Sequence, residues 1–360
     1  MQITWRWYGS NNDDITLSTI KQIPNVKGIV WSLHHKQAGE IWEEQEIEAE
    51  VKKIKDSGFS VDVVESVNVH DDIKIGLASR DHYIDIYIDT IRKLAKVGVK
   101  VICYNFMPVF DWTRTDLYHQ NDDGSNSLYY EKSLVEGVDA QTIVDRILKG
   151  ANDKTMPGWE PERLAKLQEL FDAYKDVTET KLQENLKYFL ERIIPICEEV
   201  DVKMAIHPDD PPWPIFNLPR IARSYEHLKY IVECVDSPCN GLTVCTGSLG
   251  ASGKNDLVTI TNDFKDKIFF MHIRNVKRFS NGDFVETSHK YDDGDIDIIE
   301  VMKTLHNNKY KYYIRADHGR HLWGEEKKCR PGYGLYDRAL GVMYLNGIWD
   351  TLEKSSNETK

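Results

Sequence analysis

The sequence lacks a long apolar run, a secretory signal and an excess of basic residues, and each absence argues against a class of protein. It has no apolar run that approaches the length of a membrane-spanning helix. Its first residues, MQITWRWYG, are typical of a β-strand and not of a secretory signal, which would be charged and then apolar. Basic residues are outnumbered, with 46 Lys and Arg against 58 Asp and Glu. The first two absences predict a cytoplasmic protein with no membrane partner.

The acidic balance, a formal net charge of −12, argues against nucleic acid as a substrate or partner. Phosphate binding depends on clustered Lys and Arg, so we expect a small-molecule substrate. The cysteines show neither the density of a small disulfide-rich domain nor CxxC spacing, which excludes a disulfide framework and a structural zinc cluster as first hypotheses. We expect reduced thiols at Cys103, Cys197, Cys234, Cys239, Cys245 and Cys329.

Apolar runs and helical patterns alternate along the chain. Strands alternating with helices imply parallel pairing, and eight such units close into a (β/α)8 barrel. We therefore predict an α/β fold, a TIM barrel that occupies residues 1–352 as one domain, with a disordered tail at 353–360. The predicted strands are 2–9, 26–33, 59–66, 99–106, 201–207, 240–247, 267–273 and 310–317. The predicted helices are 13–20, 40–58, 81–98, 161–174, 180–199, 218–235, 256–264, 295–305 and 335–352.

The alternation is interrupted after the fourth strand by residues 107–157, which are rich in Asp, Asn, Ser and aromatic residues. Long connections inside a compact domain are usually functional or disordered. We interpret this insertion as a lid or an oligomer contact, with Trp112 and Arg114 reaching over the barrel mouth as candidate substrate-binding residues. The expected assembly is a homo-oligomer, a dimer.

Four consecutive strands each end at or next to a good metal ligand. His207, Cys245, His272 and Asp317 occupy equivalent positions there, and neighbouring strands of a barrel lie about 5 Å apart, so the four side chains can converge on one ion. A single histidine at a strand end is more often a hydrogen-bonded rim residue, but the repetition favours a divalent metal site. Two imidazoles, a thiolate and a carboxylate could hold Zn, Fe or Mn, and affinity order alone favours Zn.

Two arginines share a strand face with these candidate ligands. Arg274 follows His272 by two residues and Arg315 precedes Asp317 by two. Each could bind a substrate carboxylate or pair with an acid inside the barrel. The run HPDDPP after the fifth strand is expected to be a proline-stiffened turn, and GSLGASG at 247–253 a glycine-rich loop whose main role is tight turning.

The motifs taken together resemble those of the mannonate dehydratase family. They are YNFMPVFDWTRTDL, HPDDPP, GLTVCTGSLG, HIRNVK, RADHGR and RPGYGLYDRALG, and they extend over nearly the whole chain. The resemblance implies a barrel like that of xylose isomerase. It also implies dehydration of D-mannonate to 2-dehydro-3-deoxy-D-gluconate and water in hexuronate (glucuronate) catabolism, with Mn2+ or Fe2+ as cofactor. One departure is Ala316, where the family motif usually has proline.

The resemblance also implies roles for individual residues. It makes His207, Cys245, His272 and Asp317 the metal ligands and places His318 and Tyr333 close to the reacting carbons. Dehydration of a sugar acid needs a base for the C2 proton and an acid for the C3 hydroxyl. The sequence leaves open which of His318 and Tyr333 is which, and aromatic packing in a lid remains the alternative for Tyr333.

Three other functions fit parts of the pattern. An aldose isomerase or epimerase on the same barrel would use a metal, but such sites usually prefer several carboxylates to a cysteine. A metal-dependent nuclease acting on damaged DNA is disfavoured by the acidic balance. A noncatalytic sugar-acid binding protein would share the cavity but form no 2-keto product.

Overall fold

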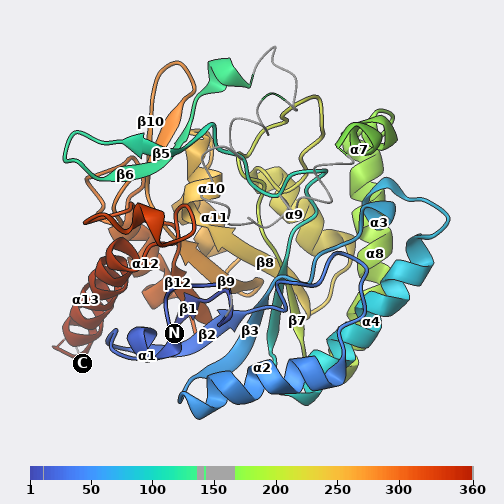
Figure 1. Ribbon diagram of the computed structural model, residues 1–360, viewed down its shortest axis with the longest axis horizontal. Coiled ribbons are helices and arrows are strands. Elements are labelled where there is room, and N and C mark those ends of the chain that lie inside the picture. The colour runs from blue at the N-terminus through green and yellow to red at the C-terminus, as the bar shows by residue number, and fades with distance from the viewer. Residues whose placement is uncertain (11, 136–141, 143–166, 359–360) are drawn as a thin grey trace.

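The computed structural model describes residues 1–10, 12–135, 142 and 167–358, and it contains a closed barrel of eight parallel strands (Figure 1). The strands follow the order β1-β12-β9-β8-β7-β4-β3-β2 around the barrel. This confirms the predicted fold class. Their bounds are β1 Gln2–Arg6, β2 Val26–Trp31, β3 Ser60–Glu65, β4 Val101–Tyr104, β7 Lys203–Ile206, β8 Asn240–Cys245, β9 Ile268–Ile273 and β12 Tyr313–Ala316.

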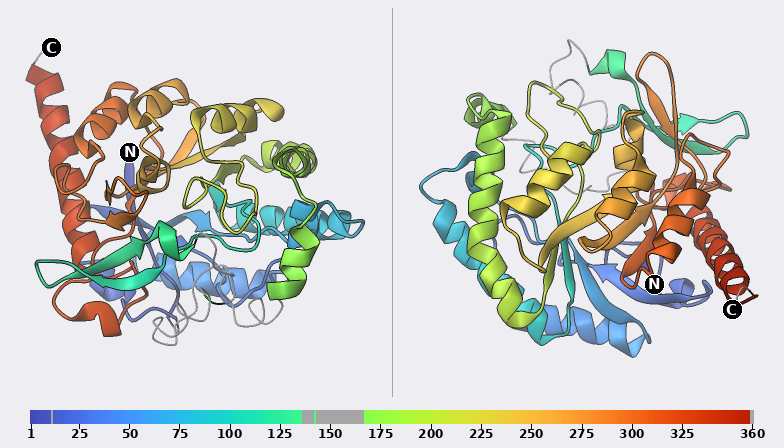
Figure 2. Two further views of the ribbon diagram at one scale, coloured as in Figure 1. Left: turned by 90° about the horizontal axis from the view of Figure 1, so that it is seen from above. Right: turned by 180° about the vertical axis from the view of Figure 1, so that it is seen from behind.

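Helices cover the outside of this barrel, as the views from above and behind show (Figure 2). Helix α2 illustrates why: Ile47, Val51 and Ile54 recur at helical spacing and are buried, while the helix ends just before Gly58, whose φ is +81°. The described helices are α1 Leu17–Ile20, α2 Glu44–Asp56, α3 Asp71–Ile75, α4 Arg80–Lys96, α7 Leu167–Tyr174, α8 Glu179–Val200, α9 Tyr225–Cys234, α10 Thr246–Ala251, α11 Leu257–Asp263, α12 Ile298–Asn307 and α13 Tyr336–Glu358, with 3-10 turns η1 Lys132–Leu134 and η2 Glu325–Lys327. Within the described residues, no helix combines the length and apolarity needed to cross a membrane.

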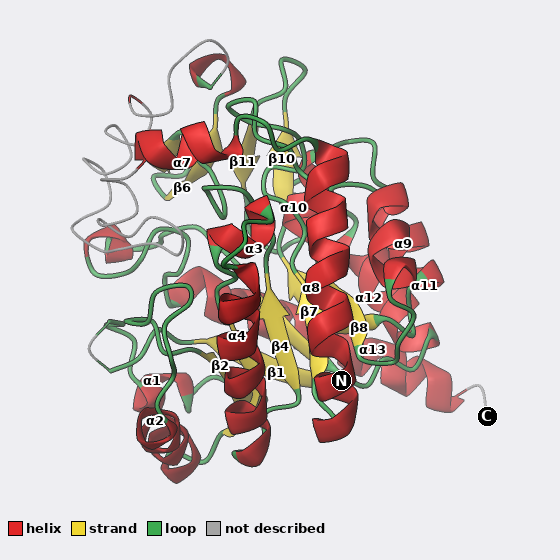
Figure 3. Cartoon of the chain, turned by 90° about the vertical axis from the view of Figure 1, so that its right-hand side faces the viewer, coloured by secondary structure: helices red, strands yellow, loops and turns green. Residues whose placement is uncertain are grey.

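A second, antiparallel sheet lies beyond one end of the barrel strands (Figure 3). Its order is β10-β11-β6-β5, with bounds β5 Asp116–Gln120, β6 Asn126–Tyr130, β10 Val276–Arg278 and β11 Phe284–Glu286. The β10-β11 hairpin turns around Asn281 and Gly282, and the β5-β6 hairpin inside the insertion was not predicted. Pairing of β11 with β6 brings the insertion against the segment that follows β9.

Only part of the predicted insertion can be compared with the structure. Residues 107–135 form β5, β6 and η1, whereas 136–141 and 143–157 lie outside the described residues. The first residues of the predicted helix 161–174, up to residue 166, also lie outside them.

The glycine-rich segment was assigned wrongly as a loop, because residues 246–251 form helix α10. Its glycines serve close packing. A Cβ on Gly247 would come within 2.5 Å of the Arg274 Cγ, and one on Gly250 within 2.4 Å of the Ile296 Cδ1. The short helix therefore lies directly against the segments that carry the candidate site.

The disordered tail was also placed wrongly, since α13 continues to Glu358 and only 359–360 lie outside the described residues. No glycine or proline interrupts the last turns. The Ser355 hydroxyl donates to the Thr351 carbonyl, and His306 on α12 lies 3.4 Å from the Glu353 carboxylate. Local helical structure thus extends beyond the predicted end at 352.

Candidate active site

Three of the four predicted metal ligands converge at the carboxyl ends of adjacent strands. His207 directly follows β7, Cys245 ends β8, and His272 is the next-to-last residue of β9. The register places Cys245 beside His272. One donor atom from each of the three side chains lies within 4.8 Å of the other two. The strand-end pattern therefore brought these residues together as predicted.

The hydrogen bonds of the two imidazoles leave their lone pairs facing this cluster. His207 Nδ1 lies 2.7 Å from the Pro208 carbonyl oxygen, which can only accept, so Nδ1 donates, and in the neutral ring the lone pair lies on Nε2. His207 Nε2 lies 3.1 Å from His272 Nδ1, and His272 Nε2 lies 3.4 Å from the Glu65 carboxylate. Outer contacts of this kind orient metal-binding histidines. The donor set fits a divalent cation.

Asp317 lies next to this cluster but is shared with two arginines. It directly follows β12, and its Oδ2 is 3.5 Å from the Cys245 Sγ. Arg274 Nε and Arg315 Nη1 lie 2.9 and 2.6 Å from its two oxygens. Burial acts to raise the pKa of Asp317, but the charge of Arg315 and other nearby cations hold that pKa well below its ordinary value. The carboxylate is thus ionised; its role as a fourth ligand stays a prediction.

Glu65 is a site residue that the sequence analysis missed. It ends β3, and its carboxylate contacts both Arg315 Nη2 at 3.1 Å and His272. Its Oε2 has no hydrogen-bond partner among the described residues, and Glu65, Cys103 and His272 form a second possible donor group. The signal was present, because a carboxylate at the last position of a buried strand is the same pattern that singled out Asp317.

Glu286 of β11 is a second site residue that the sequence analysis missed, and its carboxylate contacts His318. The His318 Nδ1 lies 3.0 Å from the Glu286 carboxylate, and both side chains are buried. Burial acts to raise the pKa of Glu286, but the charge of Arg274, together with the charge of Arg114 and the hydrogen bond from His318, lowers that pKa to about 2. Glu286 is therefore anionic at neutral pH and accepts the Nδ1 proton of His318. No local pattern in the sequence marks this glutamate.

The three arginines predicted as substrate-binding are already paired with carboxylates. Arg274 contacts Asp210 at 2.5 Å, Glu286 at 2.7 Å and Asp317. Arg114 is fully buried and contacts Asp210 at 2.8 Å and Glu286 at 2.6 Å. For Arg274 and Arg315, the structure shows the alternative role of pairing with acids.

Two interpretations from the sequence need correction here. Arg114 does not reach out over the mouth, because two carboxylates hold its guanidinium in the interior. Asp210 is more than part of a turn, since it is buried and joins Arg114 to Arg274. Direct contact of these arginines with substrate stays a prediction.

One cavity gathers most of the predicted site residues. Tyr333 is 8% exposed, and its ring lies 4.7 Å from that of His318, edge to face. The Trp112 ring lies 5.4 Å from His318 on another side. Burial raises the pKa of the Tyr333 phenol well above 10. Among the predicted residues, the cavity is lined by Trp112, His207, Arg274, Arg315, Asp317, His318 and Tyr333.

Comparison with known proteins assigns the family. The family described as D-mannonate dehydratase (UxuA) matches residues 1–359. A mannonate dehydratase of Bacillus subtilis (strain 168) is 57% identical over 353 residues, which cover 98% of each chain. One from Endomicrobium trichonymphae is 55% identical over 356 residues, 99% of this chain and 97% of that protein.

Solved structures agree with this assignment. The crystal structure of mannonate dehydratase from Streptococcus suis serotype2 matches with a TM-score of 0.89 at 40% identity, covering 99% of this chain and 96% of that one. A D-tagatose 3-epimerase-like protein, at 12% identity and a TM-score of 0.54 over 99% of this chain and 100% of that one, shares the fold alone. The family match over almost the full length, together with these relatives, shows that the chain belongs to the D-mannonate dehydratase family.

Proposed function

We propose that the chain is a hydro-lyase that converts D-mannonate to 2-dehydro-3-deoxy-D-gluconate and water in hexuronate catabolism. The observation that carries the proposal is the placement of His207 and Asp317 in the same cavity as His318 and Tyr333, beside the donor atoms of Cys245 and His272. Metal donors and two proton-transfer groups thus surround one space, as this reaction requires.

We further propose Mn2+ or Fe2+ as the cofactor, held by His207, Cys245, His272 and Asp317. When bound, the metal would supply positive charge that draws electron density from the substrate and lowers the cost of removing the C2 proton. The hydrogen bond at His207 Nδ1 directs Nε2 toward the other donor atoms, and Asp317 is ionised, which is the state that metal binding needs.

His318 is the proposed base. Glu286 accepts the proton of Nδ1, so in the neutral ring the lone pair lies on the other nitrogen, Nε2. The anionic Glu286 also stabilises the imidazolium that forms when Nε2 takes the C2 proton. Glu286 is therefore a positioning residue that acts through His318.

Tyr333 is the proposed acid. Its raised pKa keeps the phenol protonated, so it can donate to the C3 hydroxyl as that group leaves. The C2–H bond breaks and its proton goes to His318. A C2=C3 double bond then forms as the C3–O bond breaks, and the hydroxyl departs as water with the Tyr333 proton. The enol product tautomerises to the 2-keto acid, His318 releases the C2 proton to solvent, and Tyr333 recovers a proton from solvent.

The test is an assay for 2-keto product from D-mannonate, with protein stripped of metal and with Mn2+, Fe2+ or Zn2+ added back. We expect no product without metal and product with Mn2+ or Fe2+. Sugar-acid binding without product under every condition would instead assign the chain as a binding protein. The same assay with D-mannose tests the isomerase alternative.

We also propose that the protein works in the cytoplasm as a homodimer, without a nucleic acid partner. All six cysteines are free thiols, which suits a reducing compartment. An apolar surface on α13 and the preceding loop supports self-association: Trp323 is 76% exposed, and Tyr336, Leu340 and Met343 recur along one face of the helix. This surface lies outside the insertion that the sequence analysis assigned to oligomer contact.

Light scattering coupled to size exclusion tests the dimer. Leu340→Glu should shift the protein to monomer, whereas Leu77→Glu, at another exposed leucine, should not. A parent protein that elutes as a monomer would contradict the proposed homodimer.

A further inference from the structure

Arg6 differs from Arg114, Arg274 and Arg315 because it has no acid partner among the described residues. It ends β1 and is 3% exposed. Its Nε and Nη1 are buried without a hydrogen-bond partner, and no described carboxylate forms an ion pair with it. Arg114, Arg274 and Arg315 each contact at least two carboxylates. A buried charge without a partner is costly, which favours a site built for an anion that arrives from outside.

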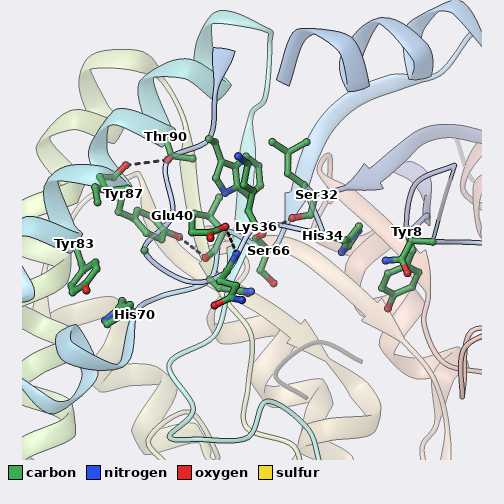
Figure 4. Close-up of a pocket in the computed structure, with 18 of the residues that line it drawn as sticks. Tyr8, Ser32, His34, Lys36, Glu40, Ser66, His70, Tyr83, Tyr87 and Thr90 are labelled. Atoms are coloured by element: carbon green, nitrogen blue, oxygen red, sulfur yellow. Dashed lines mark hydrogen bonds between the residues drawn. The ribbon is translucent and has the colours of Figure 1, made fainter. Parts of the chain in front are cut away.

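Arg6 lies at the boundary between two adjoining cavities. One is the cavity of His318 and Tyr333; the other opens between β2, β3 and α4, and both are lined by Arg6, Tyr8 and Ser66. Figure 4 shows Tyr8 and His34 close together at one end of this second cavity, away from His70 and Tyr83. A ligand held at Arg6 therefore lies next to the proposed proton-transfer residues.

Polar atoms without partners gather around Arg6. The Tyr8 hydroxyl and His34 Nε2 are buried and have no hydrogen-bond partner in the part of the chain that the structure describes. The guanidinium carbons of Arg6 and Arg330 lie 4.9 and 4.5 Å from the centre of the Tyr8 ring. Arg330 bonds only the carbonyl and side-chain oxygens of Asn12, so it too keeps its charge unopposed by an ion pair among the described residues.

The charge balance of the second cavity is also positive. Its charged lining residues are Arg6, Lys36, Glu40 and Arg330; Lys36 is paired with Glu46 at 2.6 Å, so the two arginines exceed the single remaining acid, Glu40. His34 is held neutral, since burial and the charges of Arg6 and Arg330 place its pKa well below the ordinary value. The neutral imidazole and the Tyr8 hydroxyl can donate to or accept from hydroxyl groups beside an anion.

We propose that Arg6 binds the carboxylate of the substrate and is the residue that selects a sugar acid over a neutral sugar. The proposal rests on the proposed function for the identity of the acid. A planar guanidinium matches a carboxylate with two parallel hydrogen bonds. The Tyr8 ring bridges the two groups: it lies 5.1 Å from the ring of Tyr333, so a carboxylate at Arg6 leaves C2 and C3 directed toward Tyr333 and His318.

Binding to metal-free protein tests this without turnover. Calorimetry compares D-mannonate with D-mannonamide, which has the same chain but no charge. We expect the parent protein to bind the acid about tenfold or more tightly than the amide, the size of one charge-assisted contact. Arg6→Gln should reduce the difference to less than about twofold, and Arg6→Lys, which keeps the charge, should retain part of it.

Arg92→Gln is the matched control, because it removes an exposed arginine paired with Glu199 on the outer surface. Arg92→Gln should keep the full preference for D-mannonate over D-mannonamide. Equal binding of acid and amide by the parent protein, or an undiminished preference in a folded Arg6→Gln, overturns the proposal. The first of these outcomes needs no variant. Absence of 2-keto product from the metal-loaded parent protein would instead overturn the proposed function, and the binding data would still decide the role of Arg6.

Discussion

His318 Nδ1 and Glu286 Oε2 lie 3.0 Å apart, although one residue follows a barrel strand and the other belongs to the antiparallel sheet. His318 follows the last barrel strand, and Glu286 ends β11 of the antiparallel sheet. The contact makes the antiparallel sheet part of the candidate site, because it supplies the carboxylate that holds His318.

The first prediction concerns this contact. Glu286→Gln should lower kcat about 100-fold, the low end of general acid or base contributions, because the amide no longer stabilises the imidazolium. KM for D-mannonate and metal content should change little. Glu184→Gln, on the exposed face of α8, is the control. A Glu286→Gln enzyme with parental kcat would remove Glu286 from the mechanism.

The second prediction separates the two possible donor groups. Cys245→Ser and His207→Ala should lower metal content and turnover together, since each removes a donor from the cluster with His272. Cys103→Ser removes a buried thiol from the second donor group, that of Glu65, Cys103 and His272, and this variant should keep its full metal content. Metal content is measured by elemental analysis after dialysis. Full occupancy in Cys245→Ser combined with loss in Cys103→Ser would move the ion to the group of Glu65.

The third prediction assigns the two proton-transfer steps. Tyr333→Phe keeps the ring contact with His318 and removes only the hydroxyl, so kcat should fall about 100-fold or more with metal content unchanged. In deuterated water this variant should still exchange the C2 proton of D-mannonate, whereas His318→Asn should not. Tyr336→Phe, three residues further on, is the control. Exchange retained in His318→Asn and lost in Tyr333→Phe would reverse the two roles.

The fourth prediction concerns the metal. Mn2+ or Fe2+ should support faster turnover than Zn2+, even where Zn2+ binds more tightly. A preference for tetrahedral coordination leaves no position for substrate once four protein ligands are bound. Initial rates with each ion added to stripped protein measure this. A Zn2+ enzyme that is as fast as the Mn2+ enzyme would contradict it.

The fifth prediction is a loss of stability in acid. The folded-state pKa of Glu286, about 2, lies below its ordinary value of 4.5, so its contribution to stability is complete above about pH 4.5 and disappears as pH falls toward 2. The urea midpoint should fall over this range, and Glu286→Gln should make the fall shallower. Glu184→Gln should leave the slope unchanged, and parental steepness in Glu286→Gln would show that other acids carry the effect.

The sequence predicted the barrel because its strands and helices alternate with clear periods, and it predicted the convergence of His207, Cys245 and His272 because strand ends of a parallel barrel share one face. Glu65 could have been found by the same reasoning.

Glu286 and the partners of the arginines could not have been predicted in this way. Strand β11 has three residues, too few to show a period, and its position depends on pairing with a hairpin from the insertion. The assignment of 247–253 as a loop failed for a related reason. Glycines required for close contact with Arg274 and Ile296 look, in sequence, like glycines required for turning.

The pairing of β6 with β11 also bears on how the protein folds. The Tyr129 hydroxyl donates to Asp283 across 154 residues of chain, and closing such a distance is entropically slow. The parallel barrel can bury most of its apolar surface before these two hairpins meet. During refolding, the burial of tryptophan should therefore recover ahead of full activity, because the proposed role of Glu286 requires its contact with His318.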